Sequence, residues 1–147
     1  MWVYTLRSEP YIQDQILTDL KTDLEKVQKG VAEALVNCNY TEFAQFAIRL
    51  CLEEAIVNAF RHGNRSEPGK VVKFVCKIDH ESADFKIEDE GHGFDPEGVP
   101  DPTAEENLEI PSGRGLMLMR AYMSEVAHVP PGNMLRMVYK NGPDPAD

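Results

Sequence analysis

One segment that is apolar around most of its circumference constrains the fold of this chain more than any other feature. Residues 41–62 carry apolar side chains over much of the circumference of a predicted helix. Thr41 and Glu42 at its start and Gly63 at its end are typical boundary signals of a helix. Because such a helix needs a partner over most of its surface, the segment predicts a helix packed against a sheet.

The other periodic segments supply the remaining elements. Strict alternation predicts strands, and over residues 83–89 it places Asp89 on the same face as the apolar Phe85 and Ile87. Apolar residues three or four positions apart predict helices, the first of which has Gly30 as a possible break. We therefore predict an α/β fold with strands at 1–7, 71–79, 83–89, 125–129 and 134–140, further helices at 11–36 and 114–123, and a short helical piece near 103–108.

Length and charge limit the domain organisation and the class of protein. The 147 residues fit one domain, expected over residues 1–140 and followed by a disordered tail at 141–147. A net charge of −10 excludes a protein whose main task is to grip nucleic-acid phosphates, which needs a basic surface. The three cysteines lack CxxC spacing, and no apolar run is long enough to span a membrane. We therefore expect a cytoplasmic protein without a disulfide framework or a zinc site.

Two polar residues interrupt the apolar side of the helix at 41–62. At about 100° per residue, Glu54 and Asn58 lie within about 40° of each other on an apolar face, whereas Glu53 falls on the solvent side. A carboxylate on a buried face costs several kcal/mol unless it is hydrogen-bonded, paired or facing a cleft. The pattern indicates either a cavity beside this helix or an internal hydrogen bond from Glu54 to a loop.

One glycine-containing segment follows a predicted strand, and another precedes a predicted helix. Asp89 is followed by Gly91 and Gly93, which permit a ligand to approach the backbone, although an ordinary glycine-rich turn fits equally well. Residues 112–115 lead into a predicted helix, whose exposed N–H groups and positive dipole end suit phosphate. The first segment lacks the spacing of an EF-hand, and the second lacks the Gly-Lys-Ser/Thr of a Walker A loop.

Taken together in this order, the three segments resemble a known superfamily. Residues 54–64 (EAIVNAFRHGN), 89–95 (DEGHGFD) and 113–119 (GRGLMLM) are similar to the N box and the two glycine boxes of the GHKL ATPases and kinases. Within that superfamily the chain looks like the anti-sigma-factor serine/threonine kinases of the RsbW type. The resemblance implies a Bergerat fold, a two-layer sandwich in which helices cover one face of a mixed, mostly antiparallel sheet.

The resemblance also implies roles for individual residues around ATP and Mg²⁺. Glu54 would be the catalytic general base and Asn58 the ligand of Mg²⁺, while Arg61 either reaches a phosphate or is an exposed solubilising residue. Asp89 would accept a hydrogen bond from the adenine amino group. Residues 94–112 would form a lid, with Pro111 where the family often has glycine. The base pocket and the phosphate-binding turn would be formed by Gly91 and Gly93, and by Gly113, Arg114, Gly115 and Leu116.

The function implied by the resemblance is partner switching. An RsbW-type kinase binds a sigma factor and phosphorylates a STAS-type anti-anti-sigma factor, and the family commonly forms homodimers. A sensor histidine kinase would need an acceptor histidine ahead of the N box, whereas the first histidine here is His62. We therefore expect a protein kinase without direct nucleic-acid or membrane binding. The alternatives are a nucleotide-dependent binding module that switches partners without phosphorylating them, and an ATPase without a protein substrate.

Overall fold

In the part of the chain that the structure describes, the fold consists of one five-stranded sheet and a layer of helices on one of its faces. The computed structural model describes residues 9–91, 113–129 and 133–145. The strand order is β1-β2-β3-β5-β4, and every pairing in this part of the chain is antiparallel, where a mixed and mostly antiparallel sheet was expected. The elements are β1 (Tyr11–Leu17), α1 (Leu20–Asn37), α2 (Glu42–Asn58), a π-helical turn η1 (Ala59–Gly63), β2 (Val72–Ile78), β3 (Ser82–Glu88), α3 (Gly113–Tyr122), β4 (Glu125–Val129) and β5 (Met134–Lys140).

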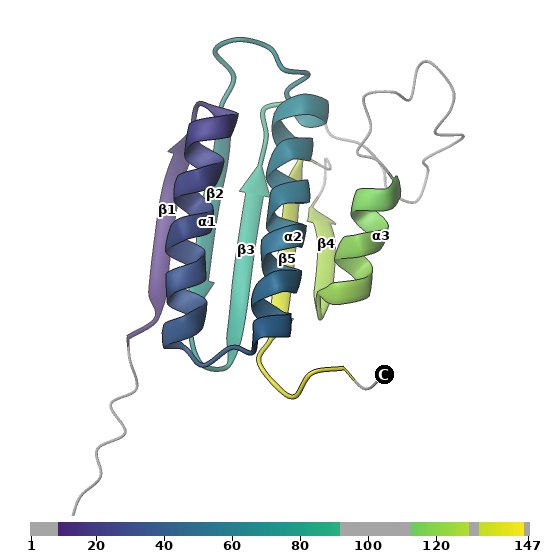
Figure 1. The fold of residues 1–147 in the computed structure, drawn as a ribbon. Helices are drawn as coiled ribbons and strands as arrows, with labels where there is room; N and C mark the ends of the chain where they lie inside the picture. The colour runs from purple at the N-terminus through teal and green to yellow at the C-terminus, as the bar shows by residue number, and fades with distance from the viewer. Residues whose placement is uncertain (1–8, 92–112, 130–132, 146–147) are drawn as a thin grey trace, which may run out of the picture.

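The helices cover the sheet in the order in which its strands lie. In Figure 1, α1 and α2 lie side by side in front of the sheet, with α3 on the far side of α2 next to β4. This confirms the predicted two-layer α/β class. No helix within the described residues is long and apolar enough to cross a membrane.

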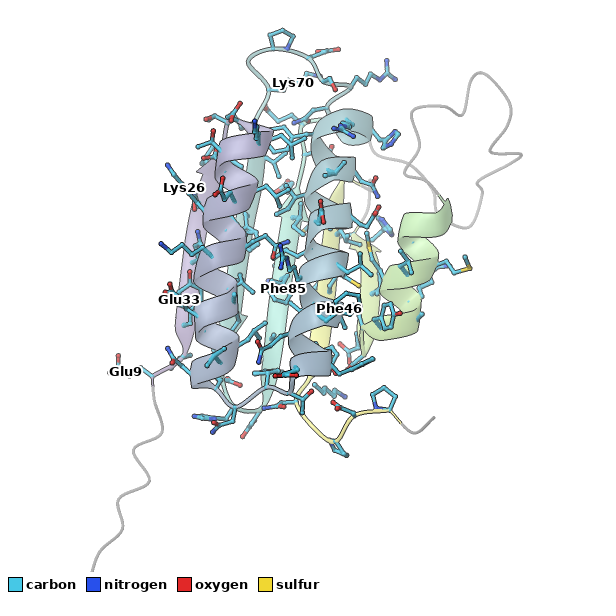
Figure 2. The ribbon with its side chains drawn as sticks, viewed as in Figure 1. Glu9, Lys26, Glu33, Phe46, Lys70 and Phe85 are labelled. Carbon is cyan, nitrogen blue, oxygen red and sulfur yellow. The ribbon has the colours of Figure 1, made fainter. Side chains whose placement is uncertain are left out.

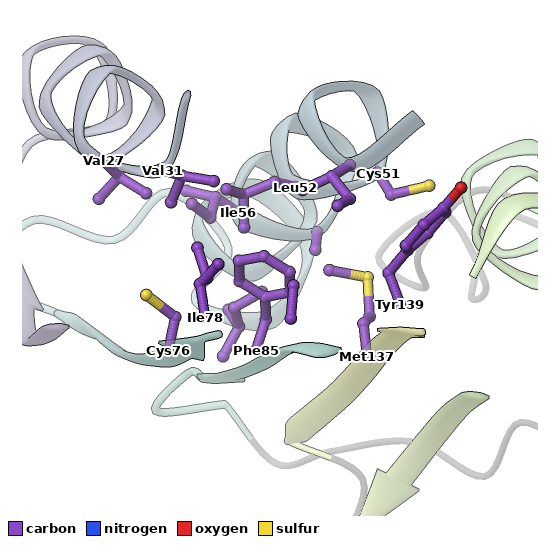
Figure 3. Close-up of a cluster of buried hydrophobic side chains, with 14 of the residues drawn as sticks. Val27, Val31, Cys51, Leu52, Ile56, Cys76, Ile78, Phe85, Met137 and Tyr139 are labelled. Carbon is purple, nitrogen blue, oxygen red and sulfur yellow. The ribbon is translucent and has the colours of Figure 1, made fainter. Parts of the chain in front are cut away.

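The core fills the space between the helix layer and the sheet. Phe74 of β2 and Phe85 of β3 are fully buried and stack with ring centroids 6.4 Å apart. Figure 3 shows how Val27 of α1 and Leu52 of α2 point down onto this face of the sheet. Burying one such side chain contributes about 1.5–3 kcal/mol. The alternating burial predicted for β2 and β3 is confirmed, since the apolar residues on the helix-facing side of both strands are buried.

The prediction of a helix beginning at residue 11 was wrong. Residues 11–17 form β1, which pairs with β2 along its whole length, and the helix begins only at Leu20. The alternation was hidden because the glutamines Gln13 and Gln15 are on the half-buried side, while Ile12 and Ile16 are 64% and 52% exposed. The predicted strand at 1–7 and the helical piece near 103–108 lie outside the described residues.

Gly30 does not break the first helix. The helix α1 continues through it to Asn37. A methyl group at Gly30 would overlap the hydroxyl oxygen of Tyr11 on the neighbouring strand. Glycine therefore allows α1 to pack closely over the edge strand β1.

Hydrogen bonds join the C-terminal segment to the end of the sheet at which the β2–β3 turn lies. The side-chain amide of Asn141 donates to the backbone carbonyls of Cys38 and His80, at 3.3 Å and 3.0 Å. The hydroxyl of Thr41 donates to the carboxylate of Asp144 at 2.5 Å. Both residues belong to the stretch that we expected to be disordered, and these bonds connect it to the start of α2 and to the β2–β3 turn.

Two aspartates fix the start of α1. Asp19 accepts from the backbone N–H of Thr22 at 2.9 Å, and Asp23 accepts from those of Thr18 and Asp19 at 2.8 Å and 3.0 Å. The hydrogen bonds from Asp19 and Thr18 lower the pKa of Asp23 below its ordinary 3.8. A carboxylate whose folded-state pKa is lowered stabilises the fold at neutral pH, and this contribution is lost as the pH falls through 3.8 and below.

Asp23→Ala is therefore expected to lower the free energy of unfolding by about 1–2 kcal/mol at pH 7. Urea denaturation of both proteins at pH 7 and pH 2.5 measures this, and the difference should shrink at the lower pH. Glu25→Ala serves as the control, because Glu25 is an exposed acidic residue two positions further along the same helix. A difference that stays the same at both pH values would contradict the assignment of the effect to the ionised carboxylate.

Candidate functional site

The end of α2 carries a buried amide with an unused hydrogen-bonding group. Asn58 is the last residue of α2 and is only 8% exposed. Its Nδ2 is buried and has no hydrogen-bond partner among the described residues. Buried polar groups are nearly always paired, so an unpaired one indicates a missing ligand, ion or water. Of the two adjacent glutamates one turn earlier, Glu54 is half-buried and Glu53 is exposed, as the helical pattern predicted.

The helix changes its winding immediately after Asn58. Residues of η1 follow a π-helical path, and the N–H of Asn64 donates to the carbonyl of Ala59 at 2.9 Å. Single π turns are frequent at functional sites. The spacing of about 100° per residue in an α-helix does not continue into this wider turn, and Arg61 is exposed there.

The carboxylate of Asp89 lies against the end of this turn. A Cβ at Gly63 would overlap the Asp89 carboxylate, and a Cβ at Gly91 would overlap the carbonyl oxygen of Gly63. The segment after β3 and the end of η1 are therefore in contact at glycine positions, where no side chain separates them. Asp89 thus lies on the helix side of the sheet, the side that strand alternation predicted.

Neighbouring groups hold Asp89 in place. Its Oδ1 accepts from the N–H of Gly91 at 2.7 Å. Its backbone N–H donates to the carbonyl of Asn133 at 2.9 Å, and the side-chain amide of Asn133 donates back to its carbonyl at 3.0 Å. Burial raises the pKa of Asp89, partly offset by the hydrogen bond from Gly91. The result is a half-buried, oriented hydrogen-bond acceptor at the end of β3.

The start of α3 lies at the same end of the molecule. The rings of Phe43, early in α2, and Tyr122, at the end of α3, meet with centroids 6.0 Å apart. Further along, the Sγ of Cys51 contacts the carbonyl oxygen of Leu118 at 3.8 Å. The two helices therefore run antiparallel, which brings the first turn of α3 close to the end of α2 (Figure 1). A helix N-terminus offers free N–H groups and the positive end of a dipole to an anion.

The fold therefore gathers most of the predicted site residues at one end of the molecule. Glu54 and Asn58 come from α2, Asp89 and Gly91 from the segment after β3, and Gly113 to Leu116 from the first turn of α3. Gly115 is buried and Leu116 half-buried. Gly93 and the predicted lid at 94–112 lie outside the described residues, as does the side chain of Arg114. Pattern analysis missed Asn64 and Asn133, because their roles depend on contacts with segments distant in the sequence.

Among the described residues, no group of side chains at this end is built to hold a divalent ion by itself. The described residues contain no cluster of three or more His, Cys, Asp or Glu side chains that could hold a metal ion. Mg²⁺ accepts one or two protein oxygens when phosphates and waters complete its shell. The side-chain amide of Asn58 also carries an oxygen that can serve as such a ligand, so the residues present fit a Mg²⁺ ion that is brought in with a phosphorylated ligand.

A groove on the outer side of the helix layer is separate from this site. It has a volume of about 650 Å³ and runs between α1 and α2. Phe46, which is labelled in Figure 2, lines it and is 59% exposed. None of the candidate site residues lines this groove. The groove is therefore separate from the end of α2, where Asn58 lies.

Comparison with known proteins gives two matches. The sequence model of the histidine kinase-like ATPase domain family matches residues 17–139. An alignment of 82 residues is 37% identical to a protein named anti-sigma F factor from Halalkalibacterium halodurans. That alignment covers 54% of this chain and 56% of the relative, so it spans about half the length of that protein.

Proposed function

This chain belongs to the histidine kinase-like ATPase domain family, and on that basis we propose that it is a protein kinase that transfers phosphate from ATP to a serine or threonine of a partner protein. Membership of the family implies that it uses ATP. The observation that carries the location of the site is the unpaired, buried amide of Asn58, one turn beyond Glu54 and at the same end as Asp89 and the start of α3.

The residues at this end have complementary roles in the proposed reaction. The carboxylate of Asp89 accepts a hydrogen bond from the adenine amino group. The first turn of α3, residues 113–116, faces the phosphates with its N–H groups. Asn58 supplies an oxygen to Mg²⁺, which neutralises phosphate charge when it is bound. Arg61 is exposed three residues after Asn58, and it contributes positive charge at the outer edge of the proposed ATP site.

Glu54 is the proposed general base. The partner's hydroxyl oxygen forms a bond to the γ-phosphorus while the bond from that phosphorus to the β–γ bridging oxygen breaks, and ADP leaves. The hydroxyl proton passes to the Glu54 carboxylate. Phosphoryl transfer depends mainly on positioning and charge stabilisation, so one oriented acceptor for this proton is sufficient.

The proposed partners follow from the similarity to a protein named anti-sigma F factor. We propose that the chain binds a sigma factor and phosphorylates a STAS-type anti-anti-sigma protein, acting as a homodimer in the cytoplasm. The net charge of −10 is consistent with protein partners in place of direct nucleic-acid contacts. The alternative is a nucleotide-dependent module that changes partners without phosphorylating them. Such a module would also use Asn58 to bind the nucleotide, but it would not need Glu54 as a proton acceptor.

A phosphoryl-transfer assay separates these functions. The purified chain is incubated with Mg²⁺-ATP and STAS-type proteins from the same cell, and each protein is analysed by intact mass spectrometry. A mass increase of one phosphoryl group on a STAS protein, mapped to serine or threonine, supports the kinase. ATP-dependent binding to a STAS protein or sigma factor without any mass increase would support the switching module.

Asn58→Leu is expected to weaken the binding of Mg²⁺-ATP by about 10–100-fold, because an oxygen ligand is lost. Folding should not suffer: leucine has a similar volume and removes a buried amide N–H group that has no partner. The free energy of unfolding without ligand should stay within about 1 kcal/mol of the wild type or rise. Calorimetric titration and urea denaturation measure the two quantities. A clearly destabilised variant with normal affinity would show that the amide serves the fold.

A further inference from the structure

Three segments near Asp89 are joined by a closed ring of hydrogen bonds. The side-chain Nδ2 of Asn64 donates to the carbonyl of Val71 at 2.9 Å. The N–H of Val71 donates to the carboxylate of Glu90 at 2.6 Å. The N–H of Glu90 donates to the Oδ1 of Asn64 at 2.6 Å, which closes the ring. The ring thus connects the end of η1, the start of β2 and the segment after β3.

Asn64 is the buried member of this ring. It is 1% exposed, and both polar atoms of its side-chain amide are used. The two residues after it, Arg65 and Ser66, have φ values of 56° and 53°, which residues other than glycine rarely adopt. Such a turn persists only where surrounding contacts fix it. The bonds of Asn64 therefore hold a particular backbone path at the end of the helix.

The ring fixes the peptide that follows Asp89. Glu90 is the next residue, so its N–H bond to Asn64 holds the backbone on one side of the Asp89 carboxylate. The carbonyl of Asp89, in the same peptide, accepts from the side-chain amide of Asn133, and on the other side the N–H of Asp89 donates to the carbonyl of Asn133. With the side chain also against Gly63, the carboxylate has little freedom to move.

This rigidity matters for the choice of nucleotide base. Adenine presents an amino donor where guanine presents a carbonyl acceptor, so a carboxylate fixed at that position accepts from adenine and repels guanine. A site whose buried polar group must be paired discriminates strongly, and a displacement of about 1 Å removes much of the benefit. A carboxylate that can turn away tolerates both bases.

We propose that Asn64 and Glu90 are positioning residues that give this site its preference for ATP over GTP by holding Asp89 through the ring with Val71. The proposal rests on the proposed function, since it assumes that Asp89 meets the nucleotide base. Neither side chain contacts the nucleotide in this proposal, and each acts through the backbone beside Asp89.

The test compares affinities for ATP and GTP in ring variants. Asn64→Leu is expected to lower the affinity for ATP by about tenfold and that for GTP by less than about twofold, so the ATP:GTP ratio falls at least about fivefold. Glu90→Ala removes the carboxylate that accepts from the N–H of Val71. Because Glu90 is exposed, this variant should fold normally, and the ATP:GTP ratio should fall by about threefold. Glu90→Gln keeps an acceptor oxygen and should restore the ratio.

A matched control separates this effect from loss of stability. Tyr40→Phe removes another half-buried hydrogen bond, to the carbonyl of Asp79 at 2.8 Å, in the β2–β3 turn at the opposite end of β3 from Asp89. It should lower the melting temperature without changing the ATP:GTP ratio. An unchanged ratio in both Asn64→Leu and Glu90→Ala would overturn the proposal. A wild-type chain that binds no ATP would overturn the proposed function as well, so the two failures are distinguishable.

Discussion

Glu54→Gln is expected to reduce the rate of phosphoryl transfer by about 10²–10⁴-fold, while the affinity for ATP changes by less than about twofold. Glutamine keeps the shape of the side chain but cannot take the proton of the attacking hydroxyl. This expectation is based on the position of Glu54, which is half-buried and lies one helical turn before Asn58 in α2. Transfer is measured on the STAS-type partner in single-turnover reactions, and ATP affinity by calorimetry.

The neighbouring glutamate provides the matched control for this prediction. Glu53→Gln makes the same chemical change one residue earlier, on the exposed side of the helix. It should leave both transfer and ATP affinity unchanged. If Glu54→Gln transfers phosphate at the wild-type rate, Glu54 is not the base. If it loses ATP affinity and transfer to the same degree, the residue acts in binding.

Gly91→Ala is expected to lower the free energy of unfolding by about 1–3 kcal/mol and to abolish measurable ATP binding. The added methyl group would overlap the carbonyl oxygen of Gly63, and a backbone atom cannot rotate out of the way. To remove this overlap, the segment after β3 must separate from η1, and this movement displaces the Asp89 carboxylate from the end of the helix. Urea denaturation and calorimetric titration with ATP measure the two effects.

Gly142→Ala is the control for the glycine substitution. A Cβ at Gly142 meets nothing within 4 Å, and the residue is exposed near the C-terminus. This variant should match the wild type in both measurements. Normal stability and affinity in Gly91→Ala would mean that the contact between the two glycines is loose in solution, and would remove the reason for placing Asp89 beside the helix end.

Periodicity in the sequence was sufficient wherever burial alternates regularly. The strands β2 and β3 each present a row of buried apolar side chains at alternate positions, so their positions were predicted to within a residue or two. Helical periodicity likewise distinguishes the half-buried Glu54 from the exposed Glu53. Periodicity failed for β1, where Gln13 and Gln15 occupy the inner side and two isoleucines the outer side. Pairing with β2, more than fifty residues away in the sequence, stabilises that strand.

The sequence alone singled out the residues to which we assign chemistry. Glu54 and Asn58 are polar where a buried helix needs apolar side chains, and Asp89 is acidic on the inner face of a strand, so their positions conflict with simple packing in a way that a pattern reveals. Only the tertiary structure decided how these residues are held. The contact between Gly63 and Gly91 and the hydrogen-bond ring of Asn64, Val71 and Glu90 join segments far apart in the chain. Such bonds depend on distances in space, because hydrogen bonding is short-ranged and directional and leaves no periodic trace in the order of residues.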